Sequence, residues 1–129
     1  MLRDNQKKII PELTKAEMEI MQVVWQIDDN FVVRDVHDRL PEPKPAYSTV
    51  STMVRILDTK GFLSHKTYGH SNVYQAAVSK AEYTDLYMHN VLHTFFDGSV
   101  SRLVNYFSQR KSISMDEADE ILQMLNNKQ

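Results

Sequence analysis

The fold is decided by one stretch of sequence, YSTVSTMVRILDTKGF at residues 47–62. Apolar side chains recur through it at helical spacing, which predicts a helix over about residues 48–60. Serine, threonine and arginine occupy positions between them, so one face of this helix should be polar. Gly61 stands where a helix commonly ends on a left-handed residue, and Phe62 follows as the apolar residue that closes such an end. The inward stripe is predicted to consist of Val50, Val54 and Leu57.

Two strand-like segments follow this helix, and a brief helix precedes it. Residues 63–67 and 73–76 flank a polar loop that contains Gly69, a pattern typical of a β-hairpin. Upstream, apolar spacing over residues 33–40 predicts a short helix, and prolines alternate through residues 41–45. Each proline biases the residue before it towards extended backbone, so this connector should be stiff.

Three further helices begin with the same signal, a hydroxyl residue followed three positions later by glutamate. In such a capping box the hydroxyl accepts from the backbone N–H of the glutamate, and the carboxylate accepts from the backbone N–H of the hydroxyl residue. The signal occurs at Thr14–Glu17, Ser79–Glu82 and Ser114–Glu117. The first of these helices should extend over about residues 15–27, and the β-branched run at 31–33 is expected to form one short strand.

The predicted order is helix, short strand, short helix, turn, helix and hairpin, which is the order of a winged helix-turn-helix domain. We therefore predict a mainly α protein with a winged helix-turn-helix DNA-binding domain at residues 1–77. Residues 78–129 have an all-helical pattern and are predicted to form a dimerisation domain. In the winged fold the third helix enters the major groove of DNA, and the hairpin wing touches the flanking backbone.

The formal charge changes sign along the chain. Its net value of −2, taken alone, argues against a nucleic-acid partner. That value divides into −3 over residues 1–43, +3 over residues 44–75 and −2 over residues 76–129. The positive segment coincides with the third helix and the wing, where phosphate contacts are needed.

The candidate DNA-contacting residues come from this positive segment. Small hydroxyls allow a helix to approach base edges closely, and arginine can bind guanine or phosphate through two donors. Basic, imidazole and phenol groups at the start of the helix and on the wing are expected to contact the DNA backbone. The predicted set is Lys44, Tyr47, Ser48, Thr49, Thr52, Arg55, His65, Lys66, Tyr68 and His70.

The C-terminal helices are expected to form a homodimer. Their apolar stripes are wide for three short helices, so burial against a second copy is favoured over folding back within a monomer. Two copies also place two recognition helices one helical turn of DNA apart, ~34 Å, as a palindromic operator requires. The predicted dimerisation residues are Tyr83, Leu86, Tyr87, Val91, Phe95, Leu103, Phe107, Ile121, Leu122 and Leu125.

Several segments together resemble the penicillinase-repressor (BlaI/MecI/CopY-type) family of bacterial transcriptional repressors. They are LTKAEMEIM at 13–21, VRDV at 33–36, YSTVST at 47–52, VSKAEY at 78–83 and DGS at 97–99. The resemblance covers nearly the whole chain from Leu13 to Asn126. It implies a dimeric repressor, with an N-terminal winged helix and a C-terminal helical dimerisation region, that binds palindromic double-stranded DNA operators and blocks transcription.

In β-lactam-responsive members of that family, a membrane sensor with a metalloprotease domain triggers cleavage within the dimerisation region. The cleaved step there is Asn-Phe, in a Leu-Val-Leu-Asn-Phe context. This chain carries Asn105, Tyr106 and Phe107 in the corresponding stretch, with Tyr106 at the position of that asparagine. The resemblance therefore implies control by proteolysis in an altered cleavage region, with a membrane sensor metalloprotease system as a partner.

Other chemistries are poorly represented. The chain has no cysteine, no phosphate-binding glycine loop and no nucleophile–base–orienter set, so an enzyme is not predicted. No cofactor, metal or small-molecule ligand is expected, and the lack of a signal peptide or membrane span predicts a cytoplasmic protein. Two alternatives stay open. One is a winged-helix protein-interaction module, and the other is a metal-responsive regulator that uses His89 and His93, which share one helix at a ligand-like spacing.

Overall fold

The structure is a computed structural model, and it describes residues 10–110 and 114–127. The chain divides into two compact units, the first ending at Tyr83 and the second beginning at Thr84. The first unit contains α2 (Lys15–Ile27), α3 (Val33–Arg39), α4 (Tyr47–Thr59), β1 (Leu63–Tyr68) and β2 (Ser71–Ala76). The second contains most of α5 (Lys80–Phe96), together with α6 (Val100–Gln109) and α7 (Met115–Asn127).

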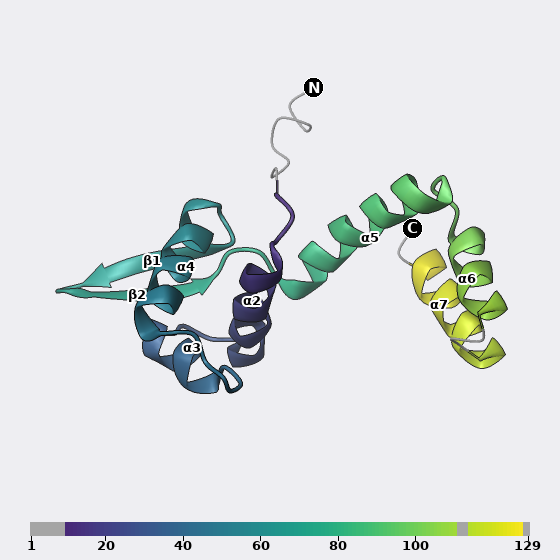
Figure 1. Ribbon diagram of the computed structural model, residues 1–129. Helices are drawn as coiled ribbons and strands as arrows, with labels where there is room; N and C mark the ends of the chain where they lie inside the picture. Colours follow the sequence, from purple (N-terminus) through teal and green to yellow (C-terminus); the bar gives the residue numbers. More distant parts are fainter. Residues whose placement is uncertain (1–9, 111–113, 128–129) are drawn as a thin grey trace, which may run out of the picture. The chain divides into compact units, whose positions relative to one another are not determined.

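Three helices and a hairpin lie together in the first unit (Figure 1), and their buried side chains form one hydrophobic core. The helices α2, α3 and α4 pack against one another, and α4 also packs against β1. The innermost apolar side chains, each at most 2% exposed, are Ile20, Met21, Val24, Phe31, Val36, Val50, Val54, Leu57, Phe62 and Val78. The predicted winged helix-turn-helix is confirmed, with the antiparallel hairpin as its wing.

The helix ends follow the signals in the sequence. In the first capping box, the Thr14 N–H donates to the Glu17 carboxylate at 2.9 Å, and the Glu17 N–H donates to the Thr14 hydroxyl at 3.2 Å. The same pair of bonds begins α5 and α7. After α4 the chain turns at Gly61, whose φ of 92° is left-handed, and the Phe62 N–H donates to the Leu57 carbonyl at 2.9 Å.

The prediction of a short strand at residues 31–33 is wrong, because only an isolated bridge forms there. Phe31 and Tyr74 exchange two backbone hydrogen bonds, of 2.9 and 2.7 Å, and α3 already begins at the last residue of the run. The Asp35 carboxylate accepts the Val32 N–H at 2.9 Å, which supports the start of the helix at this point. A helix-starting carboxylate therefore outweighs the β-branched character of the run.

The hairpin is more regular than the sequence indicates. The loop expected over residues 68–72 is shorter, because Tyr68 pairs with Ser71 at the base of the turn. Only Gly69 and His70 form the turn itself, and the φ of Gly69 is 63°, a left-handed value that glycine adopts without strain. The wing thus keeps strand pairing to its tip.

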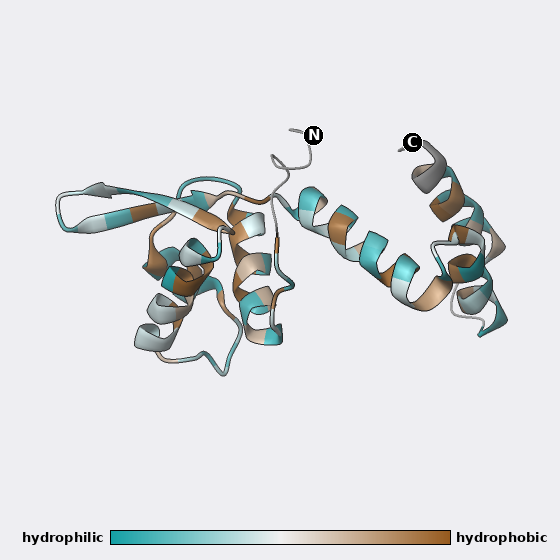
Figure 2. Cartoon of the chain, turned by 90° about the horizontal axis from the view of Figure 1, so that it is seen from above, coloured by the Kyte–Doolittle hydropathy of each residue, from teal (hydrophilic) through white to brown (hydrophobic). Residues whose placement is uncertain are grey.

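The second unit is entirely helical in its described residues. Its helices α6 and α7 pack together, and the Ser99 hydroxyl begins α6 by accepting the Arg102 N–H at 3.2 Å. Apolar and hydrophilic residues alternate along α5 (Figure 2). The buried apolar side chains of this unit are Leu92, Leu103, Val104 and Ala118. None of the helices described for this chain combines the length and the apolar character that crossing a membrane requires.

Tyr83 lies on the first turn of α5, yet it belongs to the core of the first unit. Its side chain is 6% exposed, and its ring centroid lies 6.1 Å from that of Trp25 and 5.9 Å from that of Phe62. The Leu13 N–H donates to its phenol oxygen at 2.8 Å. Tyr83, which is among the predicted dimerisation residues, packs inside the first unit, and the boundary between the two compact units falls after it, within α5.

Candidate nucleic-acid interface

The helix α4 has one fully buried face and one open face. Val50, Val54 and Leu57 have no exposed surface, so packing fixes the rotation of the helix about its own axis. Short hydroxyls and one guanidinium occupy the opposite side. The exposed members of that side are Ser48, Thr49, Thr52, Arg55 and Thr59.

The Arg55 side chain lies along its own helix, where only long hydrogen bonds hold it. Its guanidinium donates to the Ser51 hydroxyl at 3.5 Å and to the Thr52 hydroxyl at 3.4 Å. Both distances exceed the usual range for N–H···O bonds, so these bonds are weak. A base edge or a phosphate can therefore replace them at little cost, while the two hydroxyls keep the guanidinium close to the open face.

Two of the predicted contacts lie at the start of α4. Tyr47 is 46% exposed, its ring meets that of His37 edge-on at a centroid distance of 5.5 Å, and the Arg34 guanidinium lies 6.0 Å from its centroid. The Lys44 ammonium donates to the Asp38 carbonyl at 3.1 Å, which ties this side chain of the connector back to α3.

The predicted wing residues do not share one surface. His65 lies on the side of the hairpin towards α4, where its Nδ1 is 2.8 Å from the Asp58 carboxylate. Side chains alternate between the two faces of a strand, so Lys66 and Tyr68 occupy the face opposite to His65. His70 is in the turn. The structure thus places His65 beside the recognition helix, and Lys66 and Tyr68 on the other side of the wing.

Two side-chain contacts involve charged residues of the positive segment. The Lys60 ammonium lies 2.6 Å from the Glu17 carboxylate, so this cation does not project freely towards a phosphate. Asp58 is the one acidic residue of the segment 44–75, and its carboxylate faces His65. The contact with His65 holds this carboxylate between α4 and the wing.

The Glu17 carboxylate is charged although its side chain is only 6% exposed. Burial alone raises the pKa of Glu17, but hydrogen bonds from Lys60 and Thr14 and the positive charge of Lys60 outweigh burial and hold it below its ordinary value of 4.5. This carboxylate joins the start of α2 to the end of α4, and so helps to position the recognition helix.

The predicted dimerisation residues of the second unit differ in exposure. Leu86, Tyr87, Phe95 and Phe107 are exposed, Val91, Ile121 and Leu122 are half-buried, and Leu103 is buried within the unit. The side chain of Leu125 lies outside the described part of the structure. The predicted cleavage region, Asn105, Tyr106 and Phe107, is helical, because all three residues belong to α6.

The two histidines of the metal alternative lie on α5, and His89 Nδ1 is 2.7 Å from the Asp85 carbonyl oxygen. Among the residues that the structure describes, no group of three histidine, cysteine or carboxylate side chains is close enough to hold a metal ion.

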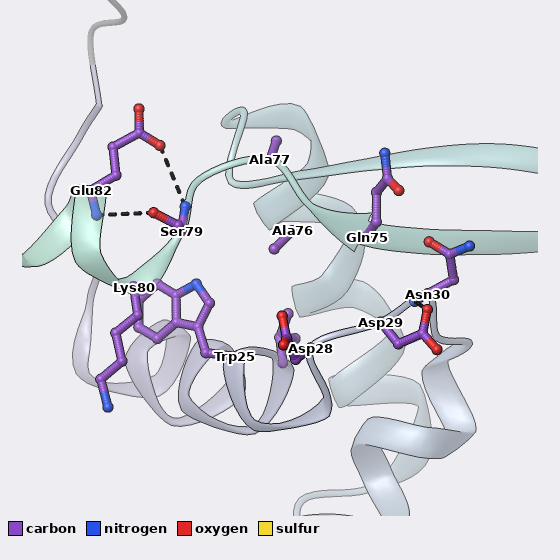
Figure 3. A pocket seen from close by; sticks show the side chains of 11 residues that line it. Trp25, Asp28, Asp29, Asn30, Gln75, Ala76, Ala77, Ser79, Lys80 and Glu82 are labelled. Atoms are coloured by element: carbon purple, nitrogen blue, oxygen red, sulfur yellow. Dashed lines mark hydrogen bonds between the residues drawn. The ribbon is translucent and has the colours of Figure 1, made fainter.

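A hollow of about 670 Å³ opens in the first unit beside Trp25, next to the end of α2 (Figure 3). Three carboxylates line it, those of Asp28, Asp29 and Glu82, against the single ammonium of Lys80. The capping box of α5 lies at its edge. An acidic lining disfavours phosphate, so this hollow is not part of the candidate interface.

Comparison with known proteins identifies the family. The sequence profile described as penicillinase repressor matches residues 13–127. The chain belongs to the penicillinase repressor family. The penicillinase repressor of Bacillus licheniformis is 30% identical, over 92% of this chain and 92% of its own length. The methicillin resistance regulatory protein MecI of Mammaliicoccus sciuri is 26% identical, over 91% of this chain and 95% of its own length.

A solved structure supports the same assignment. The solution structure of the DNA-binding domain of the repressor BlaI is similar, with a TM-score of 0.50 and 29% identity over 60% of this chain and 94% of that chain. Membership in the penicillinase repressor family confirms the resemblance drawn from the sequence segments. It also sets the protein among transcriptional repressors and not among enzymes.

Sequence reasoning missed two tertiary contacts of this penicillinase repressor family member. Arg34 lies in the net negative segment 1–43, so a charge count along the chain conceals it, although α3 brings it to the start of α4 beside Tyr47. The pairing of Glu17 with Lys60 joins residues that are distant in sequence. The capping box was the one local signal that involved Glu17. It predicts the hydrogen bonds with Thr14 but not the ion pair with Lys60.

Proposed function

We propose that this protein is a homodimeric transcriptional repressor that binds a palindromic DNA operator through α4 and the wing. One observation carries the proposal: three residues of α4 have no exposed surface, while short hydroxyls and Arg55 line the open side. A helix held in this way presents the same side chains to the major groove at every encounter. The similarity to the DNA-binding domain of the repressor BlaI supports this reading.

The proposed contacts divide between the groove and the flanking backbone. Serine and threonine hydroxyls and the Arg55 guanidinium meet base edges and nearby phosphates, where arginine can bind through two donors. The groove contacts are Ser48, Thr49, Thr52 and Arg55, and the backbone contacts are Lys44, Tyr47, His65, Lys66, Tyr68 and His70. Because His65 and Lys66 occupy opposite faces of the wing, we expect them to contact different phosphates.

The proposed dimer partner is a second copy of the chain, joined through the second unit. Large apolar side chains of α5 stand in solvent, with Phe95 73% exposed, Leu86 42% and Tyr87 41%. Only four apolar side chains are buried among the described residues of this unit, so a second copy would supply most of its core. Two joined copies bind the second half-site at a high effective concentration.

Release of the operator follows, in this proposal, from cleavage of the dimerisation region. Residues 105–107 are helical, so a protease must first open this part of α6 before the chain can enter an active site in extended form. A cut there separates α7 from the rest of the chain and weakens the dimer. The trigger proposed is a membrane sensor metalloprotease that reaches the repressor in the cytoplasm.

Sedimentation and DNA binding together test the proposal. The full chain is titrated into a labelled duplex from the region upstream of its own gene, and fluorescence anisotropy is recorded at several salt concentrations. We expect a dimer whose affinity for the duplex falls steeply with salt, because phosphate contacts release counterions. Phe95→Asp should produce a monomer with about 10²-fold weaker binding or worse, since avidity is lost.

His89→Asp is the matched control, because it introduces the same carboxylate on a different side of α5. It should leave both the dimer and the affinity unchanged. A wild-type monomer with full affinity would contradict the dimer, and a wild-type protein with no salt-dependent binding would contradict the repressor function.

A further inference from the structure

A three-residue stack joins α3 to the start of α4. The Arg34 guanidinium lies 6.0 Å from the centroid of the Tyr47 ring, and the His37 ring meets the same ring at 5.5 Å with an interplanar angle of 71°. His37 Nε2 is 3.0 Å from the Pro45 carbonyl oxygen. A carbonyl only accepts, so Nε2 carries the hydrogen, and this bond fixes the plane of the imidazole against Tyr47.

The cation–π contact with Tyr47 leaves the donors of Arg34 available. A cation–π contact acts through the charge of the guanidinium and uses none of its N–H donors. Arg34 is exposed, and within the described residues it forms no ion pair with a carboxylate. By contrast, Arg39 on the same helix donates back to the Asp35 carbonyl at 3.1 Å. Of these two arginines of α3, Arg34 is the one oriented beside the recognition helix with its hydrogen-bonding edge unused.

We propose that Arg34 is a DNA phosphate contact, and that Tyr47 and His37 position it. This inference rests on the proposed function, because it extends the DNA-binding surface from α4 and the wing to α3. The phosphate would lie beside the bases that the first turn of α4 approaches. Arginine suits that role because its fork of donors matches two oxygens of one phosphate, and the ring beneath limits the directions in which the fork can point.

The stack also gives Tyr47 a role distinct from a direct contact. Its ring is the cation–π partner of Arg34, so a variant that keeps the ring should keep the effect of Arg34. Tyr47→Phe retains the ring, whereas Tyr47→Leu retains bulk without it. The two variants separate positioning by the ring from binding by the hydroxyl.

The salt dependence of binding distinguishes a phosphate contact from a structural one. With the full-length dimer and the labelled upstream duplex, Arg34→Ala should weaken binding about tenfold at fixed salt. It should also reduce the slope of log affinity against log salt by ~0.9, the value for one lost phosphate contact. Arg39→Ala, which removes the same charge from the same helix, should leave the slope unchanged. Arg34→Lys should keep the slope but lose part of the affinity, because lysine keeps the charge without the planar fork.

A double-mutant cycle tests the positioning role. Arg34→Ala should cost as much affinity in the Tyr47→Phe background as in wild type, and much less in the Tyr47→Leu background, whatever the hydroxyl itself contributes to binding. Equal slopes for Arg34→Ala and wild type would overturn the inference, as would equal losses from Arg34→Ala and Arg39→Ala. Either result leaves the proposed function standing, since that fails only if the wild-type protein shows no salt-dependent binding.

Discussion

Replacing Glu17 by glutamine should destabilise the first unit at neutral pH. The carboxylate accepts from the Thr14 N–H at 2.9 Å and from the Lys60 ammonium at 2.6 Å. Glutamine can still cap Thr14 through its amide oxygen, but it loses the ion pair. A hydrogen bond between charged groups contributes about 1.5–3 kcal/mol. Because the Lys60 side chain is 35% exposed, water screens this pair, and we expect a loss of about 1–2 kcal/mol in the free energy of unfolding.

The loss should depend on pH in a defined direction. The pKa of Glu17 is lowered in the folded protein from its ordinary value of 4.5: burial raises it, but Lys60 and Thr14 outweigh burial. A carboxyl with a lowered folded pKa stabilises the fold above its unfolded pKa and loses that contribution as pH falls through the folded value. The difference in unfolding free energy between wild type and Glu17→Gln should therefore be constant near pH 7 and shrink as the pH falls below 4.5.

Tryptophan fluorescence during urea unfolding measures this difference in the first unit specifically. The chain has one tryptophan, Trp25, and it lies in that unit with its indole N–H donating to the Val78 carbonyl at 2.9 Å. Glu19→Gln, an exposed change on the same helix, removes the same charge and serves as the control. The reasoning is refuted if both variants lose equal stability, or if the loss from Glu17→Gln does not change down to acidic pH.

Two further predictions concern single residues. Arg55→Ala should weaken binding of the upstream duplex about tenfold or more while the protein still sediments as a dimer, and unaltered affinity at fixed salt would remove Arg55 from the interface. Tyr83→Phe should lower the unfolding free energy of the first unit by about 1–2 kcal/mol, because the Leu13 N–H loses its acceptor in a buried setting. The Trp25 signal measures this loss, and a variant as stable as wild type would show that water replaces the phenol.

Local signals in the sequence determined most of the helix boundaries. The helix expected over residues 15–27 has those bounds, since the Thr14 capping box starts it and the chain turns at Asp28 with a φ of 53°. Gly61 likewise ends α4 where the pattern placed a left-handed residue. Such ends depend on a few neighbouring residues, and sequence patterns report them well. The prediction of a strand at residues 31–33 was wrong because the structure of this run depends on Asp35 and on a partner strand that is distant in sequence.

The contacts within the candidate site were harder to predict from the sequence than the fold was. The open face of α4 follows from helical spacing alone, so Arg55 and its neighbouring hydroxyls could be named. The contacts of Lys60 with Glu17 and of Arg34 with Tyr47 could not be predicted, because these residues come together only when the helices pack. A count of charge along the chain treats Lys60 as available and overlooks Arg34. Which cations face DNA is therefore a property of tertiary structure and not of local composition.

The position of Tyr83 determines where this protein can be divided and recombined. Its ring fills the space between Trp25 and Phe62, although the residue belongs to a helix that continues into the second unit. A chimera that joins this winged helix to a foreign C-terminal region must therefore keep the first turn of α5. The junction has to lie inside a continuous helix, and the foreign segment must continue that helix in the same rotational phase. Exchange of the two regions between relatives is thus constrained by the geometry of one helix. The end of the hairpin is not the place to divide the chain.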